Sequence, residues 1–205
     1  MPITILAGDN MRSSHILRNM FEARKRVFVD LLRWDIPVID DRFEIDQFDD
    51  YHATYLILTD AGGGHLASCR LLPTQRPHIL ETLFPGLCDG PIPQGPDIYE
   101  ITRFCLDRSV KGAERRKARN RLVSAIADYA LQHGITSYTG VAEPGWFEQI
   151  KGFGWDCKPI GTVQQIGGHR LIGLHITIDA RTIAALGATG IYSGDDAGLA
   201  LAEAA

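Results

Sequence analysis

The chain has 205 residues, of which 45% are hydrophobic and 22% charged, and its formal net charge is −4. This composition is ordinary for a soluble globular protein, and the length suits one large domain with a full core. The negative charge gives no support to nucleic-acid binding, and the lack of an apolar run of about 20 residues predicts no membrane span. Because Met1–Thr4 lacks the basic start of a signal peptide, we expect a cytoplasmic protein.

The first third of the chain predicts a strand, a long helix and a polar loop. Residues 2–7 form the strand, and the helix runs over about 13–32, where apolar residues recur at the spacing of one helix face. Arg24 falls near the centre of that apolar stripe. Its guanidinium must therefore either reach out to solvent or meet buried acceptors.

The loop over 33–50 has no regular pattern of its own, which is typical of a functional or a disordered connection. Its aromatic residues argue against disorder, because they can anchor the loop. Loop acids are mostly solvated, and this is the default interpretation for Asp49 and Asp50. The spacing of Asp46 and Asp49 would turn both carboxylates to one side if the segment is helical or turned.

The middle of the chain contains three charges inside predicted strands. A hairpin is predicted from strands 51–59 and 65–72, with Arg70 inside the second strand. A short helix over 77–85 and a Pro- and Gly-rich loop follow. The next strand, 97–107, carries Glu100 and Arg103 at its centre. An unpaired charge there would cost several kcal/mol or more, so these charges either form a structural ion-pair network or line a polar pocket.

A basic segment opens the helix that ends near His133, and it runs against the helix dipole, which favours acids there. Its five cations are either a solvated helix face or a dock for an anion. They are Arg115, Arg116, Lys117, Arg119 and Arg121.

The remaining elements complete an order of β–α–ββ–β–α–β–α–ββ. The pattern predicts strands over 135–141, 155–164 and 170–178, a short helix over 145–152, and a last helix from Asp179. We expect a single domain over 1–186 and a flexible tail over 187–205. The order predicts an α/β (α+β) fold, a mixed sheet with helices on its faces.

Common catalytic motifs are missing from this sequence. There is no Walker loop, no G-x-G-x-x-G after a strand, no H-E-x-x-H and no G-x-S-x-G. The seven histidines have no metal-ligand spacing, so we expect no metal site, and the four cysteines are scattered. The charges that lie in apolar segments, with the neighbouring aromatic residues, could instead bind a zwitterion that has its own positive charge. These charges are Arg24, Arg70, Glu100 and Arg103.

These residues, in order and spacing, resemble the acyl-homoserine lactone synthase family, the LuxI-type autoinducer synthases of bacterial quorum sensing. The resemblance covers roughly residues 20–110 and runs through Arg24-x-x-x-Phe28, Trp34, Asp46-Gln47-Phe48-Asp49, Arg70-Leu71-Leu72-Pro73-Thr74 and Glu100-Ile101-Thr102-Arg103-Phe104. All eight signature positions of that family are filled. It implies a fold like the GNAT acetyltransferases, a three-layer sandwich with a mixed central sheet and helices on both faces.

The resemblance also implies a reaction. S-adenosylmethionine would supply its α-amine, and acyl carrier protein or coenzyme A would supply an acyl thioester. Lactone closure would then expel methylthioadenosine (MTA), with no cofactor because S-adenosylmethionine is a substrate. An ammonium must lose its proton before it attacks, and Glu100 is the candidate base. Phe28 and Trp34 would form part of the wall of the S-adenosylmethionine pocket. Five charged residues would orient this substrate or brace the loop of the pocket: Arg24, Asp46, Asp49, Arg70 and Arg103.

The resemblance says less about which residues contact the acyl chain and its carrier. The acyl chain would lie against Val123, Ile126, Gly140, Ala142, Trp146, Phe147 and Ile150, although apolar side chains of this kind are more often plain core. The basic segment would meet the acidic carrier protein or a coenzyme A phosphate. Family members that make 3-oxo signals often carry a Thr where Gly140 or Ala142 aligns, so we expect an unsubstituted chain, with Thr139 adjacent. Chain length, donor and oligomeric state stay open.

The two charges of the strand 97–107 also predict an irregularity in its backbone. Glu100 and Arg103 face opposite sides of a regular strand, so a shared pocket requires a β-bulge between them.

Two functions other than lactone synthesis stay open, a generic GNAT N-acyltransferase and a non-catalytic ligand sensor on the same fold. A GNAT enzyme would need a Gly-rich pyrophosphate loop before the basic helix, and Val110-Lys111-Gly112-Ala113 is a poor match for one.

Overall fold

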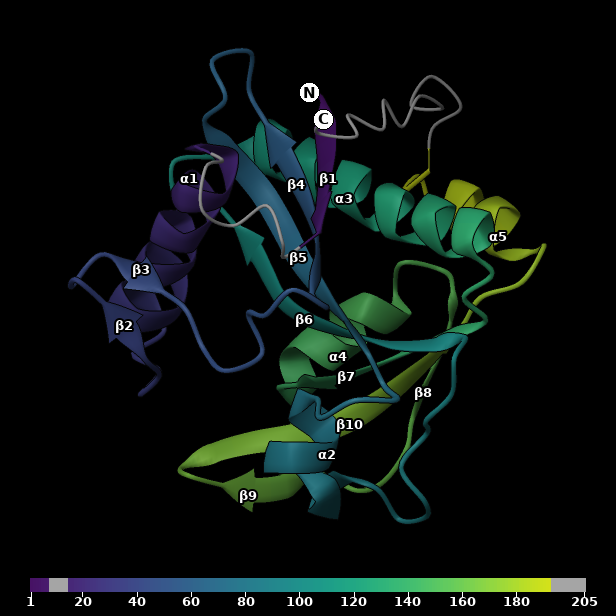
Figure 1. The fold of residues 1–205 in the computed structure, drawn as a ribbon. Coiled ribbons are helices and arrows are strands. Elements are labelled where there is room, and N and C mark those ends of the chain that lie inside the picture. The colour runs from purple at the N-terminus through teal and green to yellow at the C-terminus, as the bar shows by residue number, and fades with distance from the viewer. Residues whose placement is uncertain (8–14, 193–205) are drawn as a thin grey trace. The chain divides into compact units, whose positions relative to one another are not determined.

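The computed structural model describes residues 1–7 and 15–192, and Figure 1 shows the fold. The chain divides into two compact units. Unit 1 contains Met1–Leu71 and Arg103–Ala125, and unit 2 contains Leu72–Thr102 and residues 126–192. Strands β5 (His65–Pro73) and β6 (Ile98–Leu106) and helix α3 (Gly112–His133) each belong partly to both units.

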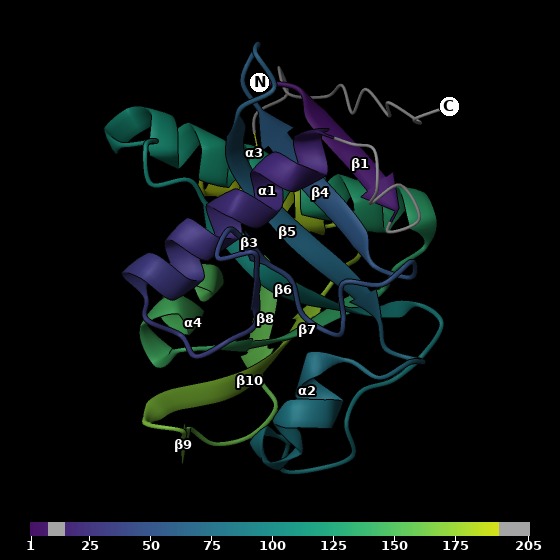
Figure 2. The same ribbon diagram turned by 60° about the vertical axis from the view of Figure 1, so that its left-hand side comes forward.

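Unit 1 is built on an antiparallel sheet. Strand β1 (Ile3–Ala7) pairs with β4 (Thr54–Thr59), and β4 pairs with β5 through the turn after Thr59. The interior positions of β4 are buried on both faces, as its Tyr-Leu-Ile-Leu run predicts. Helix α1 (His15–Arg24) packs against β4, as Figure 2 also shows, so the apolar face of this helix becomes part of the core.

The first helix changes geometry halfway along its length. After α1, residues Lys25–Leu31 continue as a π-helix, η2, which contains the buried Val27 and Phe28. π-helical segments are rare and are often found at functional sites. The change rotates the later side chains relative to a regular α-helix, so a strict 3.6-residue pattern does not place Phe28 accurately.

The segment expected to be an irregular loop contains a small hairpin instead. Strands β2 (Val38–Ile39) and β3 (Phe43–Glu44) pair antiparallel. Asp40 and Asp41 both have positive φ, 54° and 52°, a conformation that Asp tolerates better than most residues. The loop prediction was therefore wrong for these residues, and the hairpin packs β3 against α1 and η2.

Unit 2 contains a mixed sheet. Strand β6 pairs in parallel with β7 (Ser137–Ala142), and β7 pairs antiparallel with β10 (His169–Thr177). Strand β10 also pairs with β8 (Asp156–Pro159) and β9 (Gln164–Ile166). Helix α4 (Pro144–Lys151) packs on β8 and β10, helix α2 (Ile79–Leu83) packs on β7, and the short η3 (Pro85–Leu87) lies against β10.

Two glycines of unit 2 permit a close approach of backbone segments. A Cβ at Gly161 would lie 2.3 Å from the carbonyl oxygen of Leu87, and one at Gly173 would lie 3.1 Å from the same atom. These glycines are therefore required where η3 lies against β10 and the turn after β8.

The last helix, α5 (Thr182–Ala188), is followed by two residues that pack into unit 2. Ile191 is buried, and the Tyr192 hydroxyl donates to Asp128 over 3.1 Å. Order in this region thus extends past residue 186. Most of the expected tail, 193–205, lies outside the described residues, and the single domain over 1–186 stays a prediction. Within residues 1–7 and 15–192, no helix is both long and apolar enough to cross a membrane.

Candidate active site

Unit 1 contains a cluster of six charged side chains in which three guanidiniums face three carboxylates. They come from α1, the β3 hairpin with the turn after it, β5 and β6. The six are Arg24, Arg70 and Arg103, with Glu44, Asp46 and Asp49. We call this set the charge network.

Arg24 lies at the centre of the network and is 1% exposed. Its guanidinium donates to Glu44 through Nε and to Asp49 through two parallel bonds of 2.8 and 2.9 Å. The sequence left open whether this side chain reaches solvent or meets buried acceptors, and the structure shows buried acceptors. Burial lowers the pKa of Arg24, but attraction to Asp49 and Glu44 outweighs it and raises the pKa above its ordinary value.

The turn after β3 presents two carboxylates on one side, as the Asp46–Asp49 spacing suggested. The Asp49 amide donates to the Asp46 carbonyl, and the Asp46 amide donates back to the Asp49 carboxylate. Arg70 of β5 then binds Asp46 over 2.6 Å and Asp49 over 2.7 Å. The default interpretation of Asp49 as a solvated loop acid was therefore wrong, because this turn carries it into the interior.

The environment of Asp49 keeps it ionised. Burial raises the pKa of its carboxyl, but the charges of Arg24 and Arg70 more than offset this and hold the pKa well below its usual range. The Tyr55 hydroxyl donates to the same carboxylate over 2.9 Å. Burial and the negative charge of Asp49 both raise the pKa of Tyr55, so this hydroxyl stays protonated.

Arg103 occupies the more open edge of the network, with 10% of its side chain exposed. It binds Glu44 over 3.0 Å and Asp46 over 2.7 Å. Its guanidinium carbon lies 5.7 Å from the centre of the Phe28 ring and 6.0 Å from that of Trp34. The two rings stack at 4.8 Å with an interplanar angle of 19°. The aromatic pair and the charge network therefore meet at Arg103.

The backbone of Arg103 is unusual, with φ of 50° inside strand β6. Buried positions alternate over Glu100 and Thr102 and then shift by one residue to Cys105. A backbone irregularity thus lies at Arg103, where the buried positions of the strand shift by one residue, and the β-bulge itself stays a prediction. The sharing of one pocket by Glu100 and Arg103 stays a prediction.

Glu100 lies in unit 2, whereas the charge network lies in unit 1. Its side chain is fully buried, and its carboxylate accepts hydrogen bonds from the backbone amides of Ile79 and Leu80 over 2.7 and 2.9 Å. Glu100 thus binds the first turn of α2.

The three clustered carboxylates could suggest a metal site, since their oxygens lie within 4.8 Å of one another. Each of them, however, binds at least one guanidinium: Glu44 binds Arg24 and Arg103, and Arg70 binds the other two. The positive charge that a cation would supply is already provided by arginine, so the arrangement does not suit a metal.

The predicted acyl-side residues are placed mostly in the interior. Val123 and Ile126 are buried on α3, Ala142 on β7, and Phe147 and Ile150 on α4. Trp146 is half-buried on α4, and a Cβ at Gly140 would lie 3.2 Å from the Ile101 carbonyl oxygen. These positions are compatible with either a core or a tunnel wall.

The basic segment opens α3 and is solvent-facing at its start. Arg115, Arg116 and Lys117 are exposed, whereas Arg119 and Arg121 are half-buried. Arg115 donates to the Asp107 carbonyl over 3.0 Å and Lys117 binds Glu114 over 2.9 Å. Arg119 bonds the Asn120 side chain over 2.8 Å. The exposed part forms a cationic end to the helix in unit 1.

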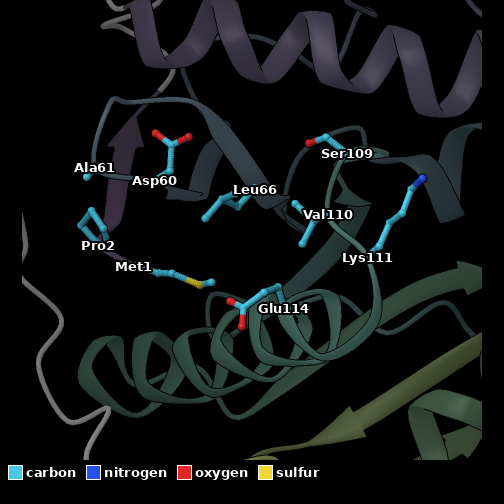
Figure 3. Close-up of a pocket in the computed structure, with 9 residues that line it drawn as sticks. All are labelled: Met1, Pro2, Asp60, Ala61, Leu66, Ser109, Val110, Lys111 and Glu114. Carbon is cyan, nitrogen blue, oxygen red and sulfur yellow. The ribbon is translucent and has the colours of Figure 1, made fainter.

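A pocket of about 490 Å³ lies beside the turn that precedes α3, as Figure 3 shows. Its lining contains the carboxylates of Asp60 and Glu114, the ammonium of Lys111 and the N-terminal residue Met1. The pocket contains none of the predicted site residues.

Sequence reasoning missed Glu44, which joins Arg24 to Arg103, and Tyr55, which completes the set around Asp49. A signal for Glu44 was available, because it lies between the apolar Phe43 and Ile45, just as Arg70 lies between Cys69 and Leu71. Sequence reasoning also gave no role to His78, and none to Thr139 beside Glu100. Both side chains are buried, and both have a polar atom without a hydrogen-bond partner.

Comparison with known proteins agrees with the geometry. The family model described as autoinducer synthase matches residues 9–186. An acyl-homoserine-lactone synthase of Ralstonia nicotianae is 34% identical over 172 residues, which cover 82% of this chain and 84% of that protein. The structure of MesI, a CoA-dependent acyl-homoserine lactone synthase, superposes with a TM-score of 0.80 at 28% identity, covering 93% of this chain and 96% of that one.

The structure of TofI in a ternary complex with an inhibitor and MTA superposes with a TM-score of 0.75 at 28% identity, covering 91% of this chain and 97% of that one. The fold is the GNAT-like α/β arrangement that the resemblance implied. The chain therefore belongs to the autoinducer synthase family, and as a member it is an acyl-homoserine-lactone synthase, an acyltransferase.

Proposed function

We propose that this chain condenses S-adenosylmethionine with an acyl thioester to give an N-acyl-L-homoserine lactone and MTA, and that the open edge of the charge network binds S-adenosylmethionine. The observation that carries the proposal is the meeting of Arg103 with the Phe28–Trp34 stack. An aromatic face attracts a sulfonium, and a guanidinium binds a carboxylate through two parallel bonds. The complex of TofI with MTA supports this choice of substrate.

The network divides into bracing residues and substrate-facing residues. Arg24, Arg70 and Asp49 are buried and bonded to one another or to Glu44, so they brace the turn after β3. Arg103 and Asp46 lie at the edge of the cluster and belong to the substrate side with Phe28 and Trp34. A buried frame of this kind holds the substrate-facing groups in one geometry.

Glu100 is the general base in this proposal. The α-ammonium of S-adenosylmethionine must lose a proton before its nitrogen can attack the thioester carbonyl. The proton passes to the Glu100 carboxylate directly or through one water, and the attacking nitrogen keeps the electron pair. A fully buried carboxylate held by two backbone amides is fixed in position, which favours proton transfer with little reorganisation.

The thioester acyl chain lies against the apolar side chains of α3, β7 and α4 named above, and the exposed cations at the start of α3 bind its carrier. Both an acyl carrier protein and coenzyme A are anionic, so the same cations suit either donor. MesI is CoA-dependent and is 28% identical to this chain, which supports acyl-CoA as one donor to be tested. Both substrates are made in the cytoplasm, and we place the enzyme there.

The proposal is tested with purified protein, S-adenosylmethionine and a panel of acyl-CoA and acyl-carrier-protein thioesters. Production of lactone and MTA in equal amounts is the expected result, and the donor with the highest kcat/KM identifies the carrier. Replacement of Glu100 by Gln should lower kcat by about 10²–10⁴-fold while S-adenosylmethionine still binds. A free N-acyl amino acid without MTA would instead identify a generic N-acyltransferase, and binding without turnover would identify a sensor.

A further inference from the structure

The carboxylate of Asp107 has hydrogen-bond partners in two separate segments of unit 1. Asp107 directly follows strand β6 and opens the turn that leads to α3. Its Oδ1 accepts from the backbone amide and the hydroxyl of Ser109 over 2.8 and 2.7 Å. Its Oδ2 accepts from the Arg26 guanidinium of η2 over 2.8 Å. One buried carboxylate therefore joins the turn before α3 to η2.

The surroundings of Asp107 keep this carboxylate ionised. The His65 imidazole, whose Nδ1 lies 3.8 Å from Asp107 Oδ2, lowers the pKa of Asp107 most. The donors of Ser109 and Arg26 lower the pKa further, so it lies well below its usual range although burial raises it. The hydrogen bonds from Ser109 and Arg26 are therefore charge-assisted, and such bonds are stronger than those between neutral groups.

The backbone of Asp107 fixes the same turn. Its amide donates to the Leu66 carbonyl of β5 over 2.9 Å. Its carbonyl accepts from the Val110 amide over 3.3 Å and from the Arg115 guanidinium over 3.0 Å. Arg115 lies in the first turn of α3, among the exposed cations that the proposed function assigns to the acyl donor. The position of these cations therefore depends on where Asp107 is held.

Segment η2 provides a fixed frame for this turn. Arg26 lies two residues before Phe28, which belongs to the wall of the S-adenosylmethionine site in the proposed function. Phe28 and Cys105 of β6 are buried in one apolar cluster, and Cys105 lies two residues before Asp107. An apolar contact and an ionic one thus hold η2 against the end of β6. The ionic contact is the one that continues into the turn before α3.

The Arg26–Asp107 pair contributes little to the stability of the fold. The Arg26 side chain is 45% exposed, and ion pairs of exposed side chains are weak in stability terms. The same guanidinium lies 3.9 Å from Glu22, one helical turn earlier, so Arg26 keeps an acidic neighbour without Asp107. The main consequence of the pair is therefore geometrical, because it fixes two segments that are 81 residues apart in the sequence.

We infer that Asp107 is a positioning residue, which holds the donor-binding start of α3 in a fixed place relative to the aromatic wall of the S-adenosylmethionine site. The inference rests on the proposed function, in which Phe28 and Trp34 hold one substrate and the start of α3 holds the other. Asp107 acts through the segments that it joins and touches neither substrate. An amine attacks a thioester carbonyl when the two atoms are about 3–3.5 Å apart, so a small shift of one binding segment lowers the rate.

Four single variants separate positioning from stability. Arg26→Gln removes the cation of the Arg26–Asp107 pair, and Arg26→Lys keeps it. Asp107→Asn keeps an oxygen for Ser109 but removes the charge that Arg26 binds. Glu22→Gln is the matched control, because it removes the other acidic neighbour of Arg26 and leaves the bond to Asp107 in place.

Steady-state assays of MTA release with an acyl-CoA and an acyl-carrier-protein thioester give kcat/KM for the donor, and calorimetry gives the Kd for S-adenosylmethionine. Arg26→Gln and Asp107→Asn should each lower kcat/KM for the donor about tenfold and leave the Kd for S-adenosylmethionine within about twofold of wild type. Because both variants break the same pair, the double variant should lose no more than the larger single loss. Arg26→Lys and Glu22→Gln should match wild type. Arg26→Gln is expected to fold, since its ion pairs are exposed, and it remains informative if Asp107→Asn does not.

Losses that add in the double variant, an equal loss in Glu22→Gln, or an unchanged kcat/KM in Arg26→Gln would overturn the positioning role while leaving the proposed function intact. A loss of S-adenosylmethionine affinity as large as the loss of donor kcat/KM would overturn it as well. A wild-type chain that makes no lactone would remove both together.

Discussion

Arg24 and Asp49 are joined inside unit 1 by two parallel hydrogen bonds of 2.8 and 2.9 Å, with both side chains buried. The pair connects the first long helix to the turn after β3, and Arg70 binds the same carboxylate from β5. Three segments far apart in the sequence are thus tied by one carboxyl group.

Removal of the Arg24 charge should destabilise the protein strongly. Arg24→Gln leaves Glu44 and Asp49 buried with one fewer cation, and loss of one partner of a buried ion pair costs about 3–5 kcal/mol. Urea denaturation followed by tryptophan fluorescence measures the free energy of unfolding. Arg26→Gln is the control, because its side chain is 45% exposed and its ion pairs with Glu22 and Asp107 should be worth about 1 kcal/mol or less. Similar losses of unfolding free energy in both variants would contradict the larger contribution expected of Arg24.

Asp49 should make stability depend on pH in the acid range. Its folded pKa lies below the unfolded value of about 3.9, so its contribution is fully present above that pH and is lost as the pH falls towards the folded pKa. The free energies of unfolding of wild type and Asp49→Asn should therefore differ most near neutral pH and converge below about pH 4. Denaturation curves at a series of pH values measure this difference, and two parallel stability profiles would be inconsistent with an ionised Asp49.

The aromatic stack should contribute to S-adenosylmethionine affinity. Trp34→Leu removes one ring of the Phe28–Trp34 pair and should raise the Kd by about 2–30-fold, the range for a partly desolvated cation–π contact of roughly 0.5–2 kcal/mol. Trp34→Phe should have a smaller effect because it keeps an aromatic face. Isothermal titration calorimetry gives both Kd values. An unchanged Kd for Trp34→Leu would show that the sulfonium does not bind at the Phe28–Trp34 pair.

The cationic start of α3 should affect the acyl donor and not S-adenosylmethionine. The double variant Arg116→Glu with Lys117→Glu should raise the KM for an acyl donor about tenfold at low salt, and less at 0.5 M salt because exposed charges are screened. The KM for S-adenosylmethionine should stay the same. Lys151→Glu with Lys158→Glu, two exposed lysines of unit 2, is the charge-matched control. Equal effects of both double variants would indicate a general response to net charge.

Part of the site could be predicted from sequence because of one physical conflict, a charge in an apolar setting. Arg70 in a predicted strand and Arg24 in an apolar helix stripe both stood out as misplaced charges. The sequence left open whether Arg24 reaches solvent, and the structure gives both side chains buried partners. Spacing in the turn correctly placed Asp46 beside Asp49.

Other features depended on tertiary structure. The π-helical segment has no local sequence signal, and it determines where Phe28 points. Glu44 was overlooked because its segment was treated as irregular, so the alternation around it was not considered. The partners of Glu100 could not be predicted, because they are backbone amides from a helix 20 residues away in the sequence.

The most direct test of the account is mass spectrometry of lactones extracted from a host that makes no such compounds and expresses either this chain or its Glu100→Gln variant. We expect N-acyl-homoserine lactones from the wild-type chain, with an unsubstituted acyl group, and at least about 100-fold less from the variant at equal protein level. A folded wild-type chain that yields no homoserine lactone would contradict the central claim.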